Sequence, residues 1–129
     1  MYLYVGKNHP LYTKDDSLID DKVLRQHKYV GLGYHSPNMD VSNQNGIERH
    51  ASCYDQEAVA TLIMSGKYLG YLPDHYARSF HSQGLVRPVN THKFTYECNF
   101  VAISRRSPKP SRIAQTFIDC LEKSHPQTQ

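Results

Sequence analysis

Residues 55–89 alternate between helix and strand patterns with short connections, and this order constrains the fold more than any other feature of the sequence. The first helix is expected over residues 55–65, where apolar residues recur at i, i+1, i+4 and i+5. Ser52 or Asp55 can cap its start, and Gly66 stands where a left-handed residue commonly ends a helix.

The rest of this segment continues the alternation. A strand at 68–72 is apolar throughout, which is typical of a strand buried on both faces. Pro73 suits the first position of a helix over residues 73–82, and residues 85–89 form another strand pattern. We therefore expect an α/β fold, in which helices cross over between the strands of one sheet.

Weaker patterns predict further elements on both sides. Residues 36–38 and 43–46 have turn composition and are expected to break the chain. The remaining predicted elements are a strand at 2–5, a helix at 18–27 opened by a capping box from Ser17 to Asp20, strands at 28–32, 47–53 and 94–104, and a last amphipathic helix capped by Ser111.

Composition narrows the class of protein. At 129 residues and 39% hydrophobic residues, the chain suits one domain or one and a half small lobes. The net charge of +3 is too small to indicate nucleic-acid binding by itself. No apolar run approaches the roughly 20 residues that cross a bilayer. Three widely spaced cysteines form no disulfide framework, which favours a reducing cytoplasm.

Motifs for catalysis, metals and cofactors are weak or missing. No nucleophile elbow, phosphate-binding loop or paired CxxC occurs, and Gly31-Leu-Gly33 lacks the helix start of a dinucleotide fingerprint. His50 and Cys53 have a ligand-like spacing, but zinc needs four converging groups. We expect no enzyme, no cofactor, no metal site and no catalytic residue. The basic cluster at 105–112 suits phosphate contacts or an ordinary solvated turn.

The order of several segments resembles the C-terminal part of LysR-type transcriptional regulators. The segments are 5–11, ending in His9-Pro10-Leu11, then 58–66 (AVATLIMSG), 69–75 (LGYLPDH), 85–86 (LV), 101–106 (VAISRR) and the last amphipathic helix. Together they cover residues 2 to about 124. Two stretches depart from the family pattern, because 66–73 and 38–46 are unusually polar.

The resemblance implies a layout for the chain. Members of this family have a DNA-binding domain, a linker helix and a two-lobed effector domain with the fold of type 2 periplasmic binding proteins. On that plan, residues 1–8 are the first strand that crosses between lobes. Residues 9–90 form the second, effector-binding lobe, a three-layer structure with a mixed sheet flanked by helices. Residues 91–129 supply a return strand and C-terminal helix of the first lobe.

A ligand of this fold is expected at the C-terminal ends of strands and the N-termini of helices. Backbone N–H groups there favour a small anionic effector, although a carboxylate at a helix start competes with it. The expected effector-binding residues are Gly33, Tyr34, His35, Ser36, Tyr54, Asp55 and Gln56.

These observations favour the effector-sensing part of a cytoplasmic LysR-type regulator, without its DNA-binding domain and the first part of the first lobe. Its expected partners are a small-molecule effector and further copies of the chain, most simply in a dimer. It should bind neither DNA directly nor a membrane. The alternatives are a lobe of a solute-binding protein, disfavoured because residues 1–10 lack signal-peptide features, and a truncated oligomerisation module.

Overall fold

The computed structural model describes residues 1–99, 101–105 and 107–124. The chain divides into two compact units, residues 1–98 and residues 99–129. Phe100, which we placed on an apolar strand face, and Arg106 of the basic cluster lie outside the described residues. The elements, in chain order, are β1 (Tyr2–Gly6), a 3₁₀ turn (Asp16–Leu18), α1 (Asp21–Leu24), β2 (Tyr29–Leu32), α2 (Pro37–Gln44), β3 (Arg49–Cys53), α3 (Gln56–Met64), β4 (Leu69–Leu72), α4 (Asp74–Ser82), β5 (Val86–Pro88) and α5 (Arg112–Ser124).

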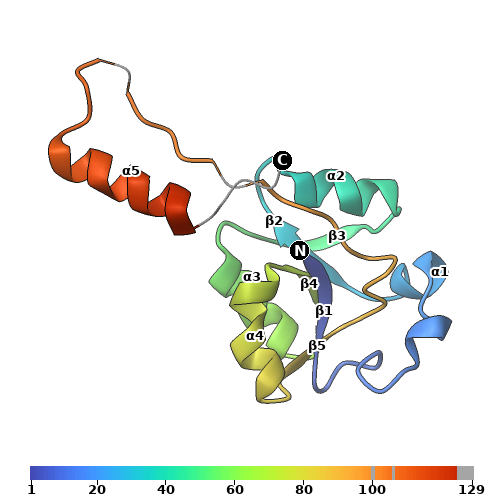
Figure 1. The fold of residues 1–129 in the computed structure, drawn as a ribbon. Coiled ribbons are helices and arrows are strands. Elements are labelled where there is room, and N and C mark those ends of the chain that lie inside the picture. Colours follow the sequence, from blue (N-terminus) through green and yellow to red (C-terminus); the bar gives the residue numbers. More distant parts are fainter. Residues whose placement is uncertain (100, 106, 125–129) are drawn as a thin grey trace. The chain divides into compact units, whose positions relative to one another are not determined.

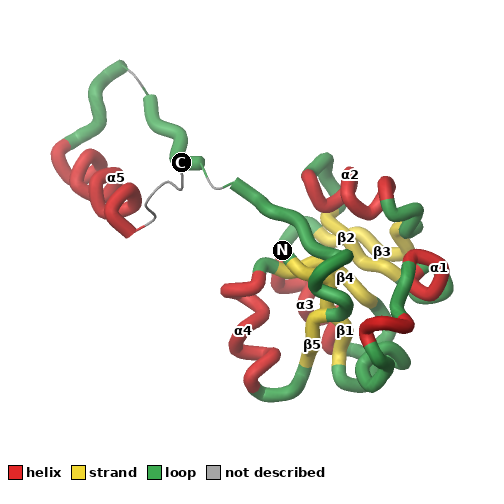
Figure 2. Tube along the Cα trace, turned by 45° about the vertical axis from the view of Figure 1, so that its right-hand side comes forward, coloured by secondary structure: helices red, strands yellow, loops and turns green. Residues whose placement is uncertain are grey.

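The first unit is built on one mixed sheet of five strands in the order β3-β2-β4-β1-β5. Strand β2 runs parallel to β3 and β4, whereas β1 runs antiparallel to β4 and β5. Helices α3 and α4 lie on one side of this sheet, and α1 and α2 on the other (Figure 1). Figure 2 shows the same three layers from a second direction. The predicted three-layer α/β fold is confirmed.

Alternating strand residues form the two halves of the core. Leu3 and Tyr71 point to the side of α1 and α2, and Tyr4 and Leu72 to the side of α3 and α4. All four residues of β4 are buried, as its apolar run predicted. The mixed sheet therefore buries both of its faces under helices.

The alternating segment at 55–89 has the predicted elements. Asp55 caps α3 by accepting a hydrogen bond from the Ala58 N–H at 2.7 Å. Gly66 follows the helix with φ +73°, and a Cβ there would lie 2.8 Å from the Asn8 side chain, so only glycine fits without strain. Pro73 stands one position earlier than we expected, as the N-cap of α4.

The predicted capping box at Ser17 is wrong. Asp20, not Ser17, caps α1 by accepting a hydrogen bond from the Val23 N–H at 2.9 Å. The Ser17 hydroxyl instead donates to Asp15 in the preceding 3₁₀ turn. A carboxylate closer to the helix start competes successfully for the free N–H groups, so the helix is shorter than predicted.

Helix α2 occupies residues that we expected to be turns. Ser36 is its N-cap residue and Pro37 its first helical residue, where the fixed φ of proline is already helical. Its side chains are mostly polar, and only Val41 and Met39 offer apolar surface, so no helical period marks it in the sequence. Asn45 and Gly46 then end the helix, with Gly46 at φ +63°.

The predicted strand at 94–104 is also wrong within the described residues. Its beginning does lie antiparallel to β1, through a single bridge between Tyr2 and Thr95. The Met1 amino group donates to the Tyr96 carbonyl oxygen at 2.9 Å, and Phe94 is fully buried in the core. In the described residues 97–99 and 101–104 no strand partner follows these contacts, so the ladder stops.

The second unit contains α5. The Ser111 hydroxyl accepts a hydrogen bond from the Ala114 N–H at 3.2 Å, so the predicted cap is confirmed. Ile113 and Phe117 of its apolar stripe are 84% and 64% exposed, respectively. This helix therefore has an amphipathic sequence whose apolar side is not covered by the described residues of its own unit.

Candidate functional site

Three helices begin at the edge of the sheet where the parallel strands end. Strands β2, β3 and β4 run in the same direction, and α2, α3 and α4 start within five residues of their ends. The first N–H groups of each helix therefore point toward this edge, together with the positive ends of the helix dipoles. The geometry of the fold thus makes this edge the natural place for a polar or anionic ligand.

The two segments that we predicted to bind effector meet here. The Gly33 N–H donates to the Cys53 carbonyl oxygen at 2.7 Å, which extends the pairing of β2 and β3 into the loops. A Cβ on Gly33 would lie 3.5 Å from the Tyr54 ring, so the ring covers the glycine backbone. Tyr54 is 79% exposed and Tyr34 is 49% exposed, so both present aromatic surface at the rim.

Two polar atoms at this edge are buried without a hydrogen-bond partner among the described residues. They are the Ser36 hydroxyl oxygen and the Gln56 side-chain carbonyl oxygen. Ser36 is the N-cap of α2 but makes no side-chain capping bond, and Gln56 is the first residue of α3. An unpaired buried polar atom costs about 1–3 kcal/mol. A polar ligand or a water bound here would remove that cost.

Asp55 and His35 have other partners. The Asp55 carboxylate accepts the Ala58 N–H as the cap of α3. The His35 Nε2 lies 3.9 Å from the Asp40 carboxylate, and both side chains are more than half exposed. Since an exposed pair of this kind contributes little to stability, His35 can reorient at low cost. A role in effector binding stays a prediction for both residues.

A buried hydrogen bond fixes the start of α2 above the sheet. The Tyr29 hydroxyl donates to the Asn38 side-chain oxygen, and Asn38 is 4% exposed. Burial raises the pKa of Tyr29, so the phenol stays protonated and keeps donating. This contact positions Ser36, two residues earlier, at the edge of the sheet.

Arg49 is a candidate site residue that the sequence analysis missed. It stands at the start of β3, but its guanidinium extends along β2 and donates from Nη1 to the Leu32 carbonyl oxygen at 2.6 Å. The same nitrogen lies 3.8 Å from the sulfur of Met39, in the first turn of α2. Gly31 makes this path possible, since a Cβ there would lie 3.3 Å from the Arg49 Cδ.

Arg49 adds positive charge to this edge. None of the ion pairs among the described residues includes it, and it lies beside the positive end of α2. In the sequence, a single arginine in a weak strand pattern does not indicate that its guanidinium extends to the end of the neighbouring strand. Only the neighbouring Gly31 could have indicated a close approach of another group.

Neither a metal cluster nor an activated Cys53 thiol accompanies this edge in the described residues. No group of three or more His, Cys, Asp or Glu side chains in them is arranged to hold a metal ion. Burial, and then the charge of Asp55, raises the pKa of the Cys53 thiol, which opposes a reactive thiolate. No described helix is both long and apolar enough to cross a membrane.

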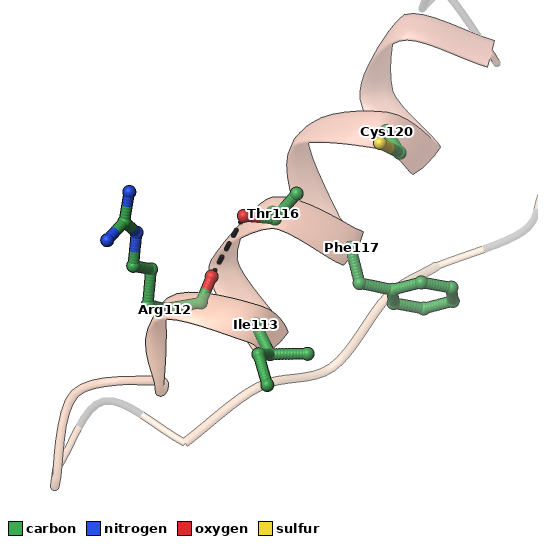
Figure 3. A pocket seen from close by; sticks show the side chains of 5 residues that line it. All are labelled: Arg112, Ile113, Thr116, Phe117 and Cys120. Carbon is green, nitrogen blue, oxygen red and sulfur yellow. Dashed lines mark hydrogen bonds between the residues drawn. The ribbon is translucent and has the colours of Figure 1, made fainter.

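A separate hollow of about 450 Å³ lies along α5 and is lined by residues of that helix alone (Figure 3). Ile113, Phe117 and Cys120 give it apolar surface, and the only hydrogen bond drawn there joins the Thr116 hydroxyl to the Arg112 carbonyl oxygen. One exposed helix face does not enclose a small molecule, so we do not regard it as a ligand site.

A three-layer lobe with helix starts gathered at one strand edge is the architecture of a periplasmic-binding-protein-like ligand-binding domain. Comparison with known families is specific: the model of the LysR substrate binding domain matches residues 1–126. The chain belongs to this family, the effector-binding domain of LysR-type regulators.

A curated relative is similar along almost the whole chain. It is the HTH-type transcriptional activator BauR of Pseudomonas aeruginosa, which is 28% identical over 123 residues. The match covers 95% of this chain and 40% of the relative. The chain therefore spans about two fifths of the length of that protein.

Proposed function

We propose that the chain senses a small carboxylate at the edge formed by the starts of α2 and α3, as part of a cytoplasmic LysR-type transcription regulator. The observation that carries the proposal is the pair of buried, unpartnered oxygens of Ser36 and Gln56 at two adjacent helix N-termini. A ligand carrying both a hydroxyl and a carboxylate would give both groups a partner, because its hydroxyl can donate to the Gln56 oxygen while its carboxylate accepts from the Ser36 hydroxyl and from the N–H groups.

Charge supports an anionic group in that ligand. Arg49 brings a guanidinium to the same edge, and guanidinium binds carboxylates through two parallel hydrogen bonds. Asp55, the N-cap of α3, has its carboxylate engaged with the Ala58 N–H, and the other acidic residues at the two helix starts are Asp40 and Glu57, in the first turns of α2 and α3. In the whole regulator, a ligand held here would bias the closure of the effector domain and so change the state of a DNA-bound domain.

The proposal is tested by the affinity of small carboxylates. Propionate and β-hydroxypropionate should bind with dissociation constants on the order of 1 mM, or about −4 kcal/mol, because one lobe leaves a ligand largely exposed. The matching amides, which lack the charge, should bind at least ten times more weakly. Nuclear magnetic resonance titration of the purified chain measures both.

Variants give this test its controls. Arg49→Gln should weaken the binding of both carboxylates about tenfold. Ser36→Ala and Gln56→Ala should each weaken the binding of β-hydroxypropionate. Arg78→Gln removes the same charge from an exposed position on α4 and should change affinity less than twofold. Wild-type affinity in both Arg49→Gln and Ser36→Ala would refute the proposed site.

Direct DNA binding is expected to be absent in this chain. The proposed sensor uses its helix N-termini for the effector, and the net charge is only +3. A mobility-shift titration at physiological salt should show weak association at most, which added salt abolishes. A tight, sequence-dependent shift would contradict this expectation.

A further inference from the structure

The first unit has a hollow of its own. It lies at the N-terminal ends of β2 and β4, at the opposite edge of the sheet from the candidate effector site. It has a volume of about 440 Å³, within the range of small-molecule sites. Its lining comes from the loop after β1, the residues that precede β2 and the loop between α3 and β4. The groups that matter for its chemistry are His9, His27, Lys28, Lys67 and Tyr68.

The two histidines form a polar wall of this hollow. His9 is 4% exposed, and its ring centre lies 4.8 Å from that of His27. The His9 Nδ1 accepts a hydrogen bond from the Leu11 N–H at 3.1 Å. In the neutral ring the proton must then be on Nε2, which makes Nε2–H a fixed donor.

Apart from the two histidines, the charged side chains that line the hollow are both lysines. Lys28 and Lys67 line it, and neither belongs to an ion pair among the described residues. No Asp or Glu is part of the lining. Burial, and then His27, lowers the pKa of His9 to about 4, and burial, and then Lys14, lowers the pKa of His27. The groups whose charge shifts these two pKa values, His27 and Lys14, both oppose a further proton on the rings.

We propose that this hollow binds the phosphate group of a small phosphorylated molecule. The oxygens of a phosphate dianion can accept hydrogen bonds from lysine ammonium groups and from the His9 Nε2–H, and its double charge balances the charges of Lys28 and Lys67, which a neutral or singly charged ligand does not. One phosphate fills only part of the hollow, so the remaining space, beside the half-buried Tyr68 ring, takes the organic part of the molecule. This site is independent of the proposed effector site and uses none of its residues.

The first experiment is a chemical-shift titration of the purified chain at constant ionic strength, with inorganic phosphate and with glycerol 3-phosphate. Both should shift the resonances of His9, His27 and Lys67 and saturate in the millimolar range, with glycerol 3-phosphate binding several times more tightly. Equal affinity for the two probes would overturn the assignment of an organic part and leave a free-phosphate site.

Charge variants test whether phosphate binding depends on the two lysines that line the hollow. Lys28→Gln with Lys67→Gln should weaken binding of both probes at least tenfold. Lys109→Gln with Lys123→Gln removes the same charge from exposed positions in the second unit and should leave affinity unchanged. Shifts that do not saturate, or that are equal in the two double variants, would mean an adventitious ion only and overturn the proposal.

A second measurement reads the histidines directly. Sulfate keeps its double charge between pH 5 and 8, and a bound dianion favours the charged imidazole. Saturating sulfate should therefore raise the pKa of His27 in the wild type and in the control double variant, but not in Lys28→Gln with Lys67→Gln. An unchanged pKa of His27 in the wild type would contradict the site. Resonance shifts confined to Ser36 and Gln56 on addition of sulfate would also contradict the phosphate site. They would leave the effector proposal standing.

Discussion

Single polar residues hold the loops of the first unit onto its sheet. Arg87 of β5 donates to the carbonyl oxygens of Leu11, Tyr12 and Lys14 and pairs with the Asp16 carboxylate at 2.8 Å. One planar guanidinium thereby provides hydrogen-bond donors for the carbonyl oxygens of a loop that has no regular secondary structure of its own. His9 has a similar role at the start of that loop, where its ring accepts the Leu11 N–H.

His9 also makes stability depend on pH. Its pKa is about 4 in the folded chain, against 6.5 ordinarily. Between these values the unfolded chain binds a proton that the folded chain does not, so the free energy of unfolding falls as the pH falls from 7 toward 4. At 1.36 kcal/mol per pKa unit the full loss is about 3 kcal/mol. Urea unfolding at pH 7, 6 and 5 measures it.

Two variants isolate this effect. His9→Asn keeps an acceptor for the Leu11 N–H and should reduce the loss of stability between pH 7 and 5. His92→Asn, at an exposed turn position, should leave that loss unchanged. The carboxylates Asp15 and Asp20 have pKa values below their ordinary 3.8, so they do not titrate in this range. Equal pH dependence in both variants would show that His9 is not responsible.

At the scale of elements, the close packing of β1 against α3 depends on one glycine. A Cβ on Gly6 would lie 2.2 Å from the Ile63 carbonyl oxygen, and backbone cannot move away as a side chain can. A Cβ on Gly33 would meet nothing closer than 3.5 Å, which is ordinary contact. The two glycines therefore have different structural importance despite similar sequence surroundings.

Gly6→Ala should lower the free energy of unfolding by about 3 kcal/mol or more, since overpacking against fixed backbone strains the strand and the helix. Gly33→Ala should change it by less than about 1 kcal/mol. Urea denaturation of the two variants and the wild type provides the comparison. A small effect at Gly6, equal to that at Gly33, would disprove the packing argument.

The elements that could be predicted from the sequence are those with an apolar period. The prediction of helix α3 was correct because buried residues such as Val59 and Ile63 recur at helical spacing, and that of strand β4 because a short apolar run suits a strand buried on both faces. Helix α2 was missed because its position depends on a tertiary hydrogen bond from Tyr29 to Asn38 rather than on an apolar stripe. The strand at 94–104 was wrong because a strand needs a partner, which a sequence pattern does not supply.

The residues of the candidate site also divide into those that the sequence could locate and those that it could not. Gly33, Ser36 and Gln56 could be located from the order of strands and helices, since that order alone places loop and helix start at one edge. Arg49 could not, because its guanidinium reaches the edge by crossing a neighbouring strand at Gly31.

Helix α5 is expected to drive self-association of the chain. Ile113 and Phe117 are 84% and 64% exposed, and exposed apolar faces of this kind mark association sites. Phe117→Asp should shift the weight-average mass in light scattering toward the monomer. Gln115→Lys places a charge on the polar side of the helix, where it faces Asp119 one turn on, and should not shift the mass. A strict monomer at high concentration, or an unchanged mass in Phe117→Asp, would contradict the expectation.

At the scale of the whole molecule, the two edges of one sheet are assigned different chemistry. The edge at the ends of β2 and β3 gathers helix N-termini, unpartnered oxygens and Arg49, whereas the opposite edge gathers His9, His27 and two lysines. The first matches the place where an open α/β sheet binds ligands, and we propose that the effector binds there. The division of residues 9–90 and 91–129 between two lobes stays a proposal.

The location of a bound carboxylate tests this account most directly. In a titration of the labelled chain with β-hydroxypropionate, the amide shifts should cluster at Gly33 to Ser36 and at Tyr54 to Gln56. Shifts at His9 and His27 should be small, since a monoanion suits the other edge poorly. Shifts that cluster on any other surface, with the residues at the starts of α2 and α3 unaffected, would contradict the proposed effector site even though the chain is a LysR effector domain.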